Sequence, residues 1–269
     1  MKTLKKDLLK VNIYESRKAM GDAAAADIKA CMLSLLETKE SINMIFAAAP
    51  SQNEVLAALA TDKDIPWSRV NAFHMDEYIG LPKGAPQRFG NFLNDHIFGL
   101  APFKSVNYID ASAQDAEAEC ARYTKLLQDN PTDIVVLGIG ENGHIAFNDP
   151  PVADFQDDKL IKPVKLDEIC RNQQVNDGCF AKLEDVPKTA LTLTVPALFA
   201  GKYLFCIVPA KTKAEAVKNT IHGAISEACP ASILRRHENA ILYLDSDSSA
   251  LLQIIQKTAA DRRSAAVFC

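Results

Sequence analysis

The sequence predicts an α/β fold: a Rossmann-like three-layer αβα sandwich around a mostly parallel central sheet. Short apolar segments alternate with amphipathic segments along most of the chain, which is the pattern of buried strands and covering helices. Hydrophobic residues make up 48% of the 269 residues. This is enough for one large core, and the chain is too short to require several domains. We therefore expect a single domain over residues 1–269.

The predicted strands are short, and most of their residues are apolar or β-branched. Such segments are typical of strands that are buried on both faces. Because these strands alternate with helices, we expect mostly parallel neighbours and helices on both sides of the sheet. The predicted strands span residues 41–49, 70–74, 133–138, 190–195, 203–208 and 240–244.

The predicted helices lie between these strands and have the spacing of one apolar face. They span residues 16–39, 52–60, 88–98, 113–128, 212–222 and 248–260, with Ser16 as the N-cap of the first. The segment 150–187 differs, because it is polar, rich in Asp, Lys and Gln, and interrupted by prolines. Long segments of this kind are often binding loops, so we expect an irregular lid there.

Charge and cysteine content exclude several classes of protein. The formal net charge of −4 gives no general attraction to nucleic acid or to an anionic membrane. No apolar run approaches the roughly 18 residues of a membrane-spanning helix, and the N-terminus lacks the apolar region of a signal peptide. The seven cysteines show no Cys-x-x-Cys spacing, which favours reduced thiols in the cytoplasm. The five histidines do not pair with cysteines at ligand spacing, so no zinc site is expected.

Three predicted strands end in residues that can carry chemistry. In open α/β sheets, ligands bind at the carboxyl ends of the strands, so we expect these ends to share one crevice. The first end, residues 49–51, precedes a helix and is a natural anion site, although Ser51 can also serve only as a helix cap. The second end carries Asp76 and Glu77, two adjacent carboxylates that are costly to bury unless they are paired or used. Solvation at the surface is the ordinary alternative for this pair, and His74 beside it is interpreted as a packing residue or a partner of the site.

The third end is the glycine-rich segment LGIGENGHIAFNDP that follows another predicted strand. Its glycines, Gly140 and Gly143 among them, allow the backbone to approach a small ligand closely. His144 is the histidine of this segment, and an imidazole can both give and take a proton in catalysis. Asn142 and Asp149 flank this histidine and can fix its tautomer. A structural histidine in a glycine turn is the alternative, but the coincidence of three such strand ends favours a functional site.

Three motifs carry a resemblance to a known family: FHMDEYIGL at 73–81, LGIGENGHIAFNDP at 137–150 and VPKTALTL at 186–193. Together they resemble the glucosamine-6-phosphate deaminases/isomerases, over roughly residues 42–245. The resemblance implies opening of an amino-sugar phosphate ring, aldose–ketose isomerisation and release of ammonia to leave a ketohexose phosphate. It implies a cytoplasmic hydrolase and isomerase of amino-sugar and N-acetylglucosamine catabolism. It also implies no metal or organic cofactor, a small-molecule amino-sugar phosphate as the partner, and either a monomer or a homo-oligomer.

The resemblance also assigns roles to matching residues. Asp76 matches the base that takes the C2 proton of the substrate and returns it to C1. His144 matches the residue that moves protons during ring opening, and Lys213 matches the lysine that pairs with the substrate phosphate. The loop Ala49-Pro50-Ser51 matches the phosphate loop, in which the proline of this chain removes one N–H donor.

This chain departs from the family pattern beside the histidine. The founding enzymes carry Asp at the position of Asn142 and Glu at the position of Asp149. Our hypothesis is that Asp149 supplies the negative charge that pairs with His144. Further candidate substrate-binding residues are Glu77, Gly140, Gly143 and, in the lid segment, Lys162 and Arg171.

Two other functions stay open from sequence alone. A 6-phosphogluconolactonase-type hydrolase belongs to the same superfamily, but its histidine motif usually continues into Thr-Ala-Ser rather than Ile-Ala-Phe-Asn. A non-catalytic sugar-phosphate sensor would normally carry a DNA-reading module, and the residues before Ser16 are too few for a helix-turn-helix. Among amino-sugar phosphates, the sequence does not choose between the glucosamine and the galactosamine compound.

Overall fold

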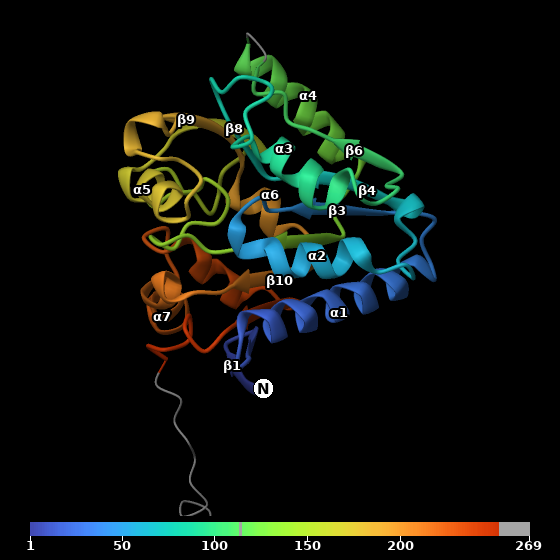
Figure 1. Cartoon of the computed structure of the whole chain (residues 1–269), viewed down its shortest axis with the longest axis vertical. Helices are drawn as coiled ribbons and strands as arrows, with labels where there is room; N and C mark the ends of the chain where they lie inside the picture. Colours follow the sequence, from blue (N-terminus) through green and yellow to red (C-terminus); the bar gives the residue numbers. More distant parts are fainter. Residues whose placement is uncertain (113–114, 253–269) are drawn as a thin grey trace, which may run out of the picture.

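The computed structural model describes residues 1–112 and 115–252, which form two sheets covered by helices (Figure 1). Within these residues the larger sheet has eight strands in the order β1-β2-β11-β10-β7-β3-β4-β6. They are β1 (Lys2–Lys6), β2 (Leu9–Ile13), β3 (Ile42–Phe46), β4 (Val70–His74), β6 (Ser105–Asn107), β7 (Ile134–Leu137), β10 (Tyr203–Val208) and β11 (Ala240–Leu244). Its neighbouring strands pair in parallel apart from the β1–β2 hairpin. The predicted mostly parallel sheet is confirmed.

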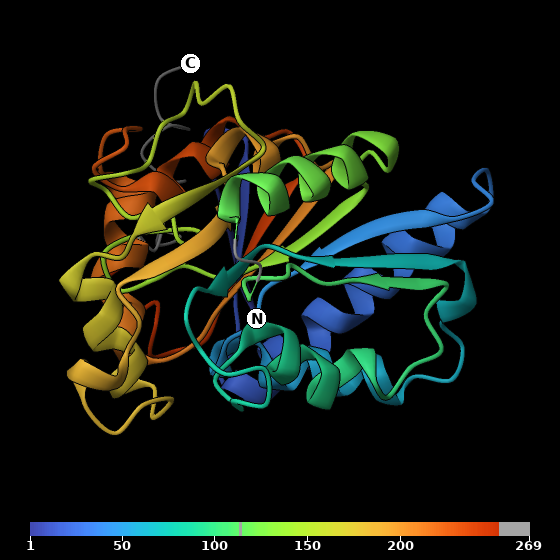
Figure 2. The ribbon, with the colours of Figure 1, turned by 90° about the horizontal axis from the view of Figure 1, so that it is seen from above.

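Helices cover both faces of this sheet, and the strands bury side chains on both sides (Figure 2). In β7, Val135 and Leu137 pack into one core while Ile134 and Val136 pack into the other. This alternation follows from the two-residue period of a strand. One core contains residues of α1 (Arg17–Leu36), α2 (Asn53–Thr61) and α3 (Phe89–Leu93), and the other contains residues of α4 (Ala116–Asp129), α6 (Val195–Phe199) and α7 (Ala214–His222).

Local signals in the sequence explain where the first two helices lie. The Ser16 hydroxyl accepts a hydrogen bond from the Ala19 N–H at 3.2 Å, which confirms Ser16 as the N-cap of α1. Gly21 allows α1 and α2 to pack closely, since a β-carbon there would lie 2.5 Å from the β-carbon of Glu54. The two helices therefore lie side by side against the sheet (Figure 1).

A second sheet lies beside the larger one and corrects two expectations. Its strands are β5 (Asp76–Tyr78), β9 (Thr189–Leu193) and β8 (Ile161–Lys165), in the order β5-β9-β8 and antiparallel. The segment predicted at 190–195 is thus a strand, but it does not join the parallel sheet. Nor is the segment 150–187 irregular throughout, because it contains β8 and the helix α5 (Glu168–Asn176). The strand pairing and the Asp167 N-cap of α5 supply the order that composition does not reveal.

The end of the described chain differs from prediction. In the helix predicted at 248–260, residues 248–251 lie in turns and residue 252 has no regular structure. The rest of that prediction falls outside the described residues, as do residues 113 and 114. None of the helices within residues 1–112 and 115–252 combines the length and the apolarity needed to cross a membrane.

Candidate active site

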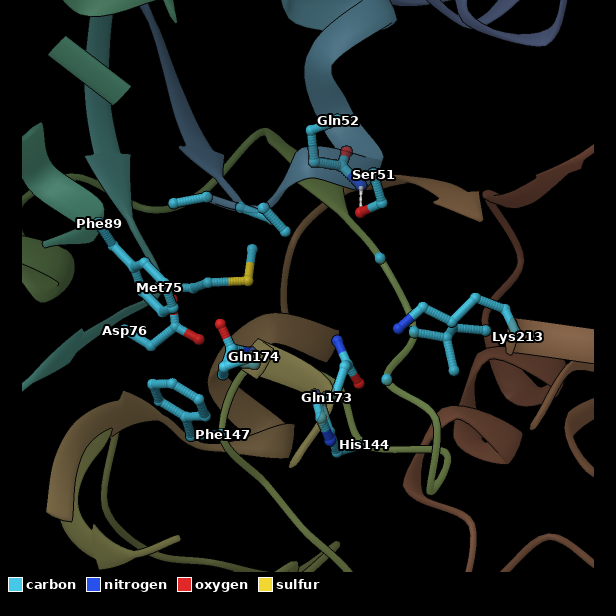
Figure 3. Close-up of a pocket in the computed structure, with 17 residues that line it drawn as sticks. Ser51, Gln52, Met75, Asp76, Phe89, His144, Phe147, Gln173, Gln174 and Lys213 are labelled. Carbon is cyan, nitrogen blue, oxygen red and sulfur yellow. Dashed lines mark hydrogen bonds between the residues drawn. The ribbon is translucent and has the colours of Figure 1, made fainter. Parts of the chain in front are cut away.

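A pocket opens where β3, β4, β7 and β10 of the larger sheet end, as expected for an open α/β sheet (Figure 3). It holds about 490 Å³ of empty space, including its mouth. Asp76, His144 and Lys213 line this one pocket although they lie far apart in sequence. The expectation that the strand ends with the candidate site residues share one crevice is therefore confirmed. The other lining residues are Ala47, Ala48, Ala49, Ser51, Gln52, Met75, Phe89, Gly138, Ile139, Gly140, Ala146, Phe147, Gln173 and Gln174.

Asp76 begins β5 and is almost fully buried, with 6% of its surface exposed. Burial raises the pKa of its carboxyl well above the ordinary value of 3.8, and the neighbouring Glu77 carboxylate raises it further. His74 fixes the backbone here: its Nε2 accepts from the Ile109 N–H at 2.8 Å, so its Nδ1 carries the proton and donates to the Asp76 carbonyl at 2.9 Å. Burial lowers the pKa of His74 to about 4, so the imidazole stays neutral. His74 is thus a partner of the site rather than a lining residue.

Glu77 lies outside the pocket, which corrects its prediction as a substrate-binding residue. Successive side chains of a strand point to opposite faces, so Glu77 faces away from Asp76. Its carboxylate accepts hydrogen bonds from the backbone N–H groups of Tyr78, Phe89 and Gly90, at 2.9 to 3.0 Å. Glu77 therefore holds the start of α3, and this anchors Phe89 in the pocket wall.

His144 presents its Nε2 edge to the pocket because its Nδ1 is engaged behind it. Nδ1 lies 2.7 Å from Asn142 Oδ1 and 3.0 Å from Asp149 Oδ1. Both partners accept hydrogen bonds, so the geometry assigns the proton to Nδ1 and leaves the Nε2 lone pair for a ligand. The His144 backbone N–H also donates to Asn142 Oδ1, at 3.1 Å.

Asp149 is fully buried and saturated with donors. It accepts from the Asn142 amide at 3.0 Å and from the Asp167 N–H at 3.0 Å, besides its contact with His144. Burial alone would raise the pKa of Asp149, but hydrogen bonding and attraction from His144, with help from Asn142 and Asp167, lower it below its ordinary value. Asp149 is therefore a carboxylate at neutral pH, which supports the hypothesis that it balances the charge of His144.

Steric contacts explain why two positions of the glycine-rich motif carry glycine. A β-carbon on Gly140 would lie 2.0 Å from Cε1 of His144, so the imidazole can rest only on a bare backbone. Gly143 has φ = +85°, and a β-carbon there would lie 2.7 Å from the sulfur of Cys229. Gly140 lines the pocket, whereas Gly143 turns the loop without lining it, so the structure does not bring Gly143 to the substrate.

The contact between Gly140 and the imidazole yields a prediction. Gly140→Ala should lower turnover about a hundredfold, because the methyl group must push His144 away from its position. Turnover of purified protein measures this. Gly84→Ala is the matched control, since nothing lies within 4 Å of a β-carbon there and no positive φ is present. Equal activity of the two variants would mean that the position of His144 is unimportant.

Lys213 ends a short 3-10 helix, Lys211–Lys213, before α7 and is 3% exposed. Its ammonium has no hydrogen-bond partner within residues 1–112 and 115–252 and points into the pocket (Figure 3). Burial lowers the pKa of this amine, which shows that its charge is poorly solvated. A buried cation without a partner is costly unless an anion binds there. The arrangement is thus a preformed anion site.

The loop after β3 lies beside this lysine, and part of it reaches the pocket. Ser51 Oγ accepts from Gln52 Nε2 at 3.0 Å, so the serine hydroxyl retains its own proton for a ligand. Gln52 is held in turn by the Ile207 carbonyl at 3.1 Å. Ala49 and Ser51 line the pocket, while Pro50 faces a neighbouring cavity instead.

The two basic residues predicted from the lid segment do not reach the pocket. Lys162 donates to Asp157 at 2.6 Å and to the Val152 carbonyl at 2.8 Å. Arg171 donates to the backbone carbonyls of Leu183 and Val186, at 2.7 and 2.9 Å. Both cations are used to hold the segment itself together, so neither is available to an anion in this pocket.

Sequence reasoning missed two amides that this segment does supply. Gln173 and Gln174 of α5 both line the pocket. Gln173 accepts from the Glu141 N–H at 2.8 Å and so ties α5 to the glycine-rich loop. Among the described residues, the Gln174 side chain has no hydrogen-bond partner and is free for a ligand. No motif marks these residues, because only the fold brings α5 over the strand ends.

The chain matches the family model of glucosamine-6-phosphate isomerases/6-phosphogluconolactonase over residues 15–243. It belongs to this family. A glucosamine-6-phosphate deaminase of Listeria monocytogenes is 35% identical over 215 residues, which cover 80% of this chain and 90% of the relative. Another, of Bacillus thuringiensis, is 37% identical over 218 residues, which cover 81% and 80%.

Two solved structures are also similar to this chain. A monomeric glucosamine-6-phosphate deaminase matches with a TM-score of 0.81 and 28% identity, covering 90% of this chain and 99% of that one. The 6-phosphogluconolactonase of Thermotoga maritima matches with a TM-score of 0.72 and 23% identity, covering 87% and 98%. The second similarity shows a shared fold.

Proposed function

We propose that this enzyme converts an amino-sugar 6-phosphate and water into a ketohexose 6-phosphate and ammonia. The observation that carries the proposal is the common pocket of a buried acid, a polarised imidazole and an unpaired ammonium: Asp76, His144 and Lys213. The relatives named above as glucosamine-6-phosphate deaminases support the same reaction.

The phosphate group is assigned to the Lys213 side of the pocket. The lysine offers three N–H donors and a compact charge, and the Ser51 hydroxyl offers one further donor. Figure 3 shows Lys213 and Asp76 on opposite sides of the pocket, with Gln173, Gln174 and His144 between them. A phosphate on Lys213 therefore directs the far end of the sugar, with C1 and C2, towards Asp76.

Asp76 is assigned as the base that moves a proton between C2 and C1. The raised pKa of its buried carboxyl makes the ionised form a stronger base than an exposed aspartate. C1 and C2 are adjacent, so one carboxylate can take the proton from one carbon and return it to the other. Phe89 and Phe147 in the pocket wall limit access of water to this transfer.

His144 is assigned to ring opening. Its Nε2 can take the proton of the anomeric hydroxyl and return it to the ring oxygen, while Asp149 stabilises the imidazolium that forms between the two steps. Hydrolysis of the C2 imine then consumes one water and releases ammonia.

The direct test is to mix the purified protein with glucosamine 6-phosphate and, separately, galactosamine 6-phosphate, and to follow ammonia. Ammonia from either compound supports the proposal, and the ratio of kcat/KM values names the preferred sugar. Hydrolysis of 6-phosphogluconolactone without ammonia from either sugar would assign the alternative hydrolase activity. Binding of all three compounds without turnover would make the protein a sensor.

Loss of the negative charge behind His144 should slow the reaction. Asp149→Asn is expected to lower kcat about ten- to a hundredfold with little change in KM, because Asp149 is shielded from the pocket and acts through the imidazole. Steady-state kinetics measure the split. Asp158→Asn, at an exposed position of the same segment, is the matched control. An Asp149→Asn enzyme with wild-type kcat would remove Asp149 from proton transfer.

A further inference from the structure

A cluster of three metal-ligating side chains lies behind the catalytic imidazole. A ring nitrogen of His144, a carboxylate oxygen of Asp149 and the sulfur of Cys170 all lie within 4.8 Å of one another, and Nδ1 of His144 is 3.0 Å from Oδ1 of Asp149. All three residues are buried. The spacing of residues in the sequence does not predict this cluster, because only the fold brings Cys170, in the first turn of α5, to the other two residues.

The donor set suits zinc. One imidazole nitrogen, one carboxylate oxygen and one thiolate are the ligand types of zinc sites, whereas Mg²⁺ and Ca²⁺ prefer oxygen ligands. With the usual zinc–ligand distances, a tetrahedral ion needs about 3.4 Å between nitrogen and oxygen and about 3.6 Å between sulfur and nitrogen. The nitrogen and oxygen are already 3.0 Å apart, and no pair of ligand atoms exceeds 4.8 Å. Shifts of about 1 Å or less therefore bring the three ligands to an ion.

The surroundings supply the rest of such a site. The Asp167 N–H holds Oδ2 of Asp149 at 3.0 Å, and Oδ1 becomes available to an ion once the Asn142 amide, which donates to it at 3.0 Å, moves away. Asn142 accepts the Nδ1 proton of His144 at 2.7 Å, so this amide must turn aside, and its oxygen or a water can fill the fourth position. A zinc ion with one carboxylate, one thiolate and a neutral imidazole carries no net charge, which lowers the cost of burial.

We propose that His144, Asp149 and Cys170 form an inhibitory binding site for Zn²⁺. The ion replaces the Nδ1 proton and takes the carboxylate away from the imidazole. His144 then no longer alternates between its neutral and protonated forms, so proton transfer at Nε2 stops. Metal binding stands on the three ligands alone, and only its effect on turnover rests on the proposed function.

The binding test uses Co²⁺ as a spectroscopic substitute for Zn²⁺ on chelator-treated full-length protein. Wild type should give a thiolate-to-cobalt charge-transfer band that saturates at one ion per chain and disappears when Zn²⁺ is added. Cys170→Ser should lose the band and bind Zn²⁺ about a hundredfold more weakly in competition with a chromophoric chelator. Cys179→Ser, a half-buried cysteine beyond the end of α5, should keep both properties. No band in wild type, or an undiminished band in Cys170→Ser, would overturn the site.

The activity test separates this site from the function. In chelator, Cys170→Ser should turn over at close to the wild-type rate, and Cys170→Ala serves if the serine variant does not fold. Zn²⁺ should then inhibit wild type near one equivalent, whereas the variant needs about a hundredfold more. A cobalt band in a protein that releases no ammonia would refute the proposed function and keep the metal site. Ammonia release that Zn²⁺ inhibits equally in wild type and variant would refute the inhibitory role of this site.

Discussion

Asp76→Asn is expected to reduce ammonia release between about a hundredfold and ten-thousandfold, the range of general base catalysis. The amide keeps the shape of the side chain but cannot take the C2 proton. Exchange of that proton with deuterated solvent, followed by NMR, should be lost to the same extent. Binding of the sugar phosphate should stay near the wild-type affinity, because the phosphate is assigned to Lys213 at the other side of the pocket. Exchange at the wild-type rate would remove Asp76 from its role.

The same substitution should stabilise the fold at neutral pH. Burial raises the pKa of Asp76 above the unfolded value of 3.8. The folded state therefore binds this proton more tightly than the unfolded state, and the resulting stability is fully present below 3.8 and is lost as pH rises towards the folded pKa. The asparagine variant does not titrate, so its advantage in the free energy of unfolding should grow over that range. Urea unfolding at several pH values measures the difference, and a variant that is less stable at every pH would contradict the assigned pKa shift.

Lys213→Met should strongly weaken anion binding and also stabilise the protein. Loss of a buried charge–phosphate contact costs about 2–5 kcal/mol, so the affinity for the sugar phosphate should fall from about thirtyfold to several thousandfold. Burial of the wild-type lysine destabilises the folded protein, because among the described residues its ammonium has no partner and its pKa is lowered. Its cost to the fold is absent above about pH 10.5 and grows as pH falls towards the folded pKa. Methionine fills a similar space without that cost.

Thermal unfolding with inorganic phosphate distinguishes the two effects of Lys213→Met. Without phosphate, the variant should melt about 2–4 °C higher than wild type. With phosphate in excess, wild type should gain stability through binding and the variant should not. Lys211→Met, on the same 3-10 helix but exposed, is the matched control and should respond to phosphate like wild type. Equal stabilisation of the Lys213 variant by phosphate would place the anion elsewhere.

The sequence predicts the parallel sheet well because apolar strand runs and helix caps are both local signals, each contained in a few neighbouring residues. Buried strands such as β7 and β10 are continuous apolar runs, and Ser16 marks the start of α1. Strand β9 shows the limit: its residues are strand-like, but pairing with β5 rather than with the parallel sheet depends on distant residues. Short strands such as β5, with three residues, carry too little pattern to be found.

The residues of the candidate site also divide into those that the sequence could predict and those that it could not. Asp76 and His144 could be found because they lie in segments that follow predicted strands, where an open α/β sheet places ligands, and Lys213 was found through the family resemblance. Gln174 could not, since it enters the pocket from a helix whose position depends on the contacts of Asp167 and Gln173. Arg171 was predicted to contact an anion because it is a cation in a polar segment. Its guanidinium instead donates hydrogen bonds to two backbone carbonyls.

A crystal structure of Asp76→Asn with the amino-sugar phosphate that wild type turns over would test the shared pocket most directly. It should show one sugar with a phosphate oxygen about 3 Å from Lys213 Nζ. C2 should lie against the side chain of residue 76, and the ring oxygen should face His144 Nε2. A sugar whose phosphate lies away from Lys213, or whose C2 cannot reach residue 76 while the phosphate is bound, would contradict the account.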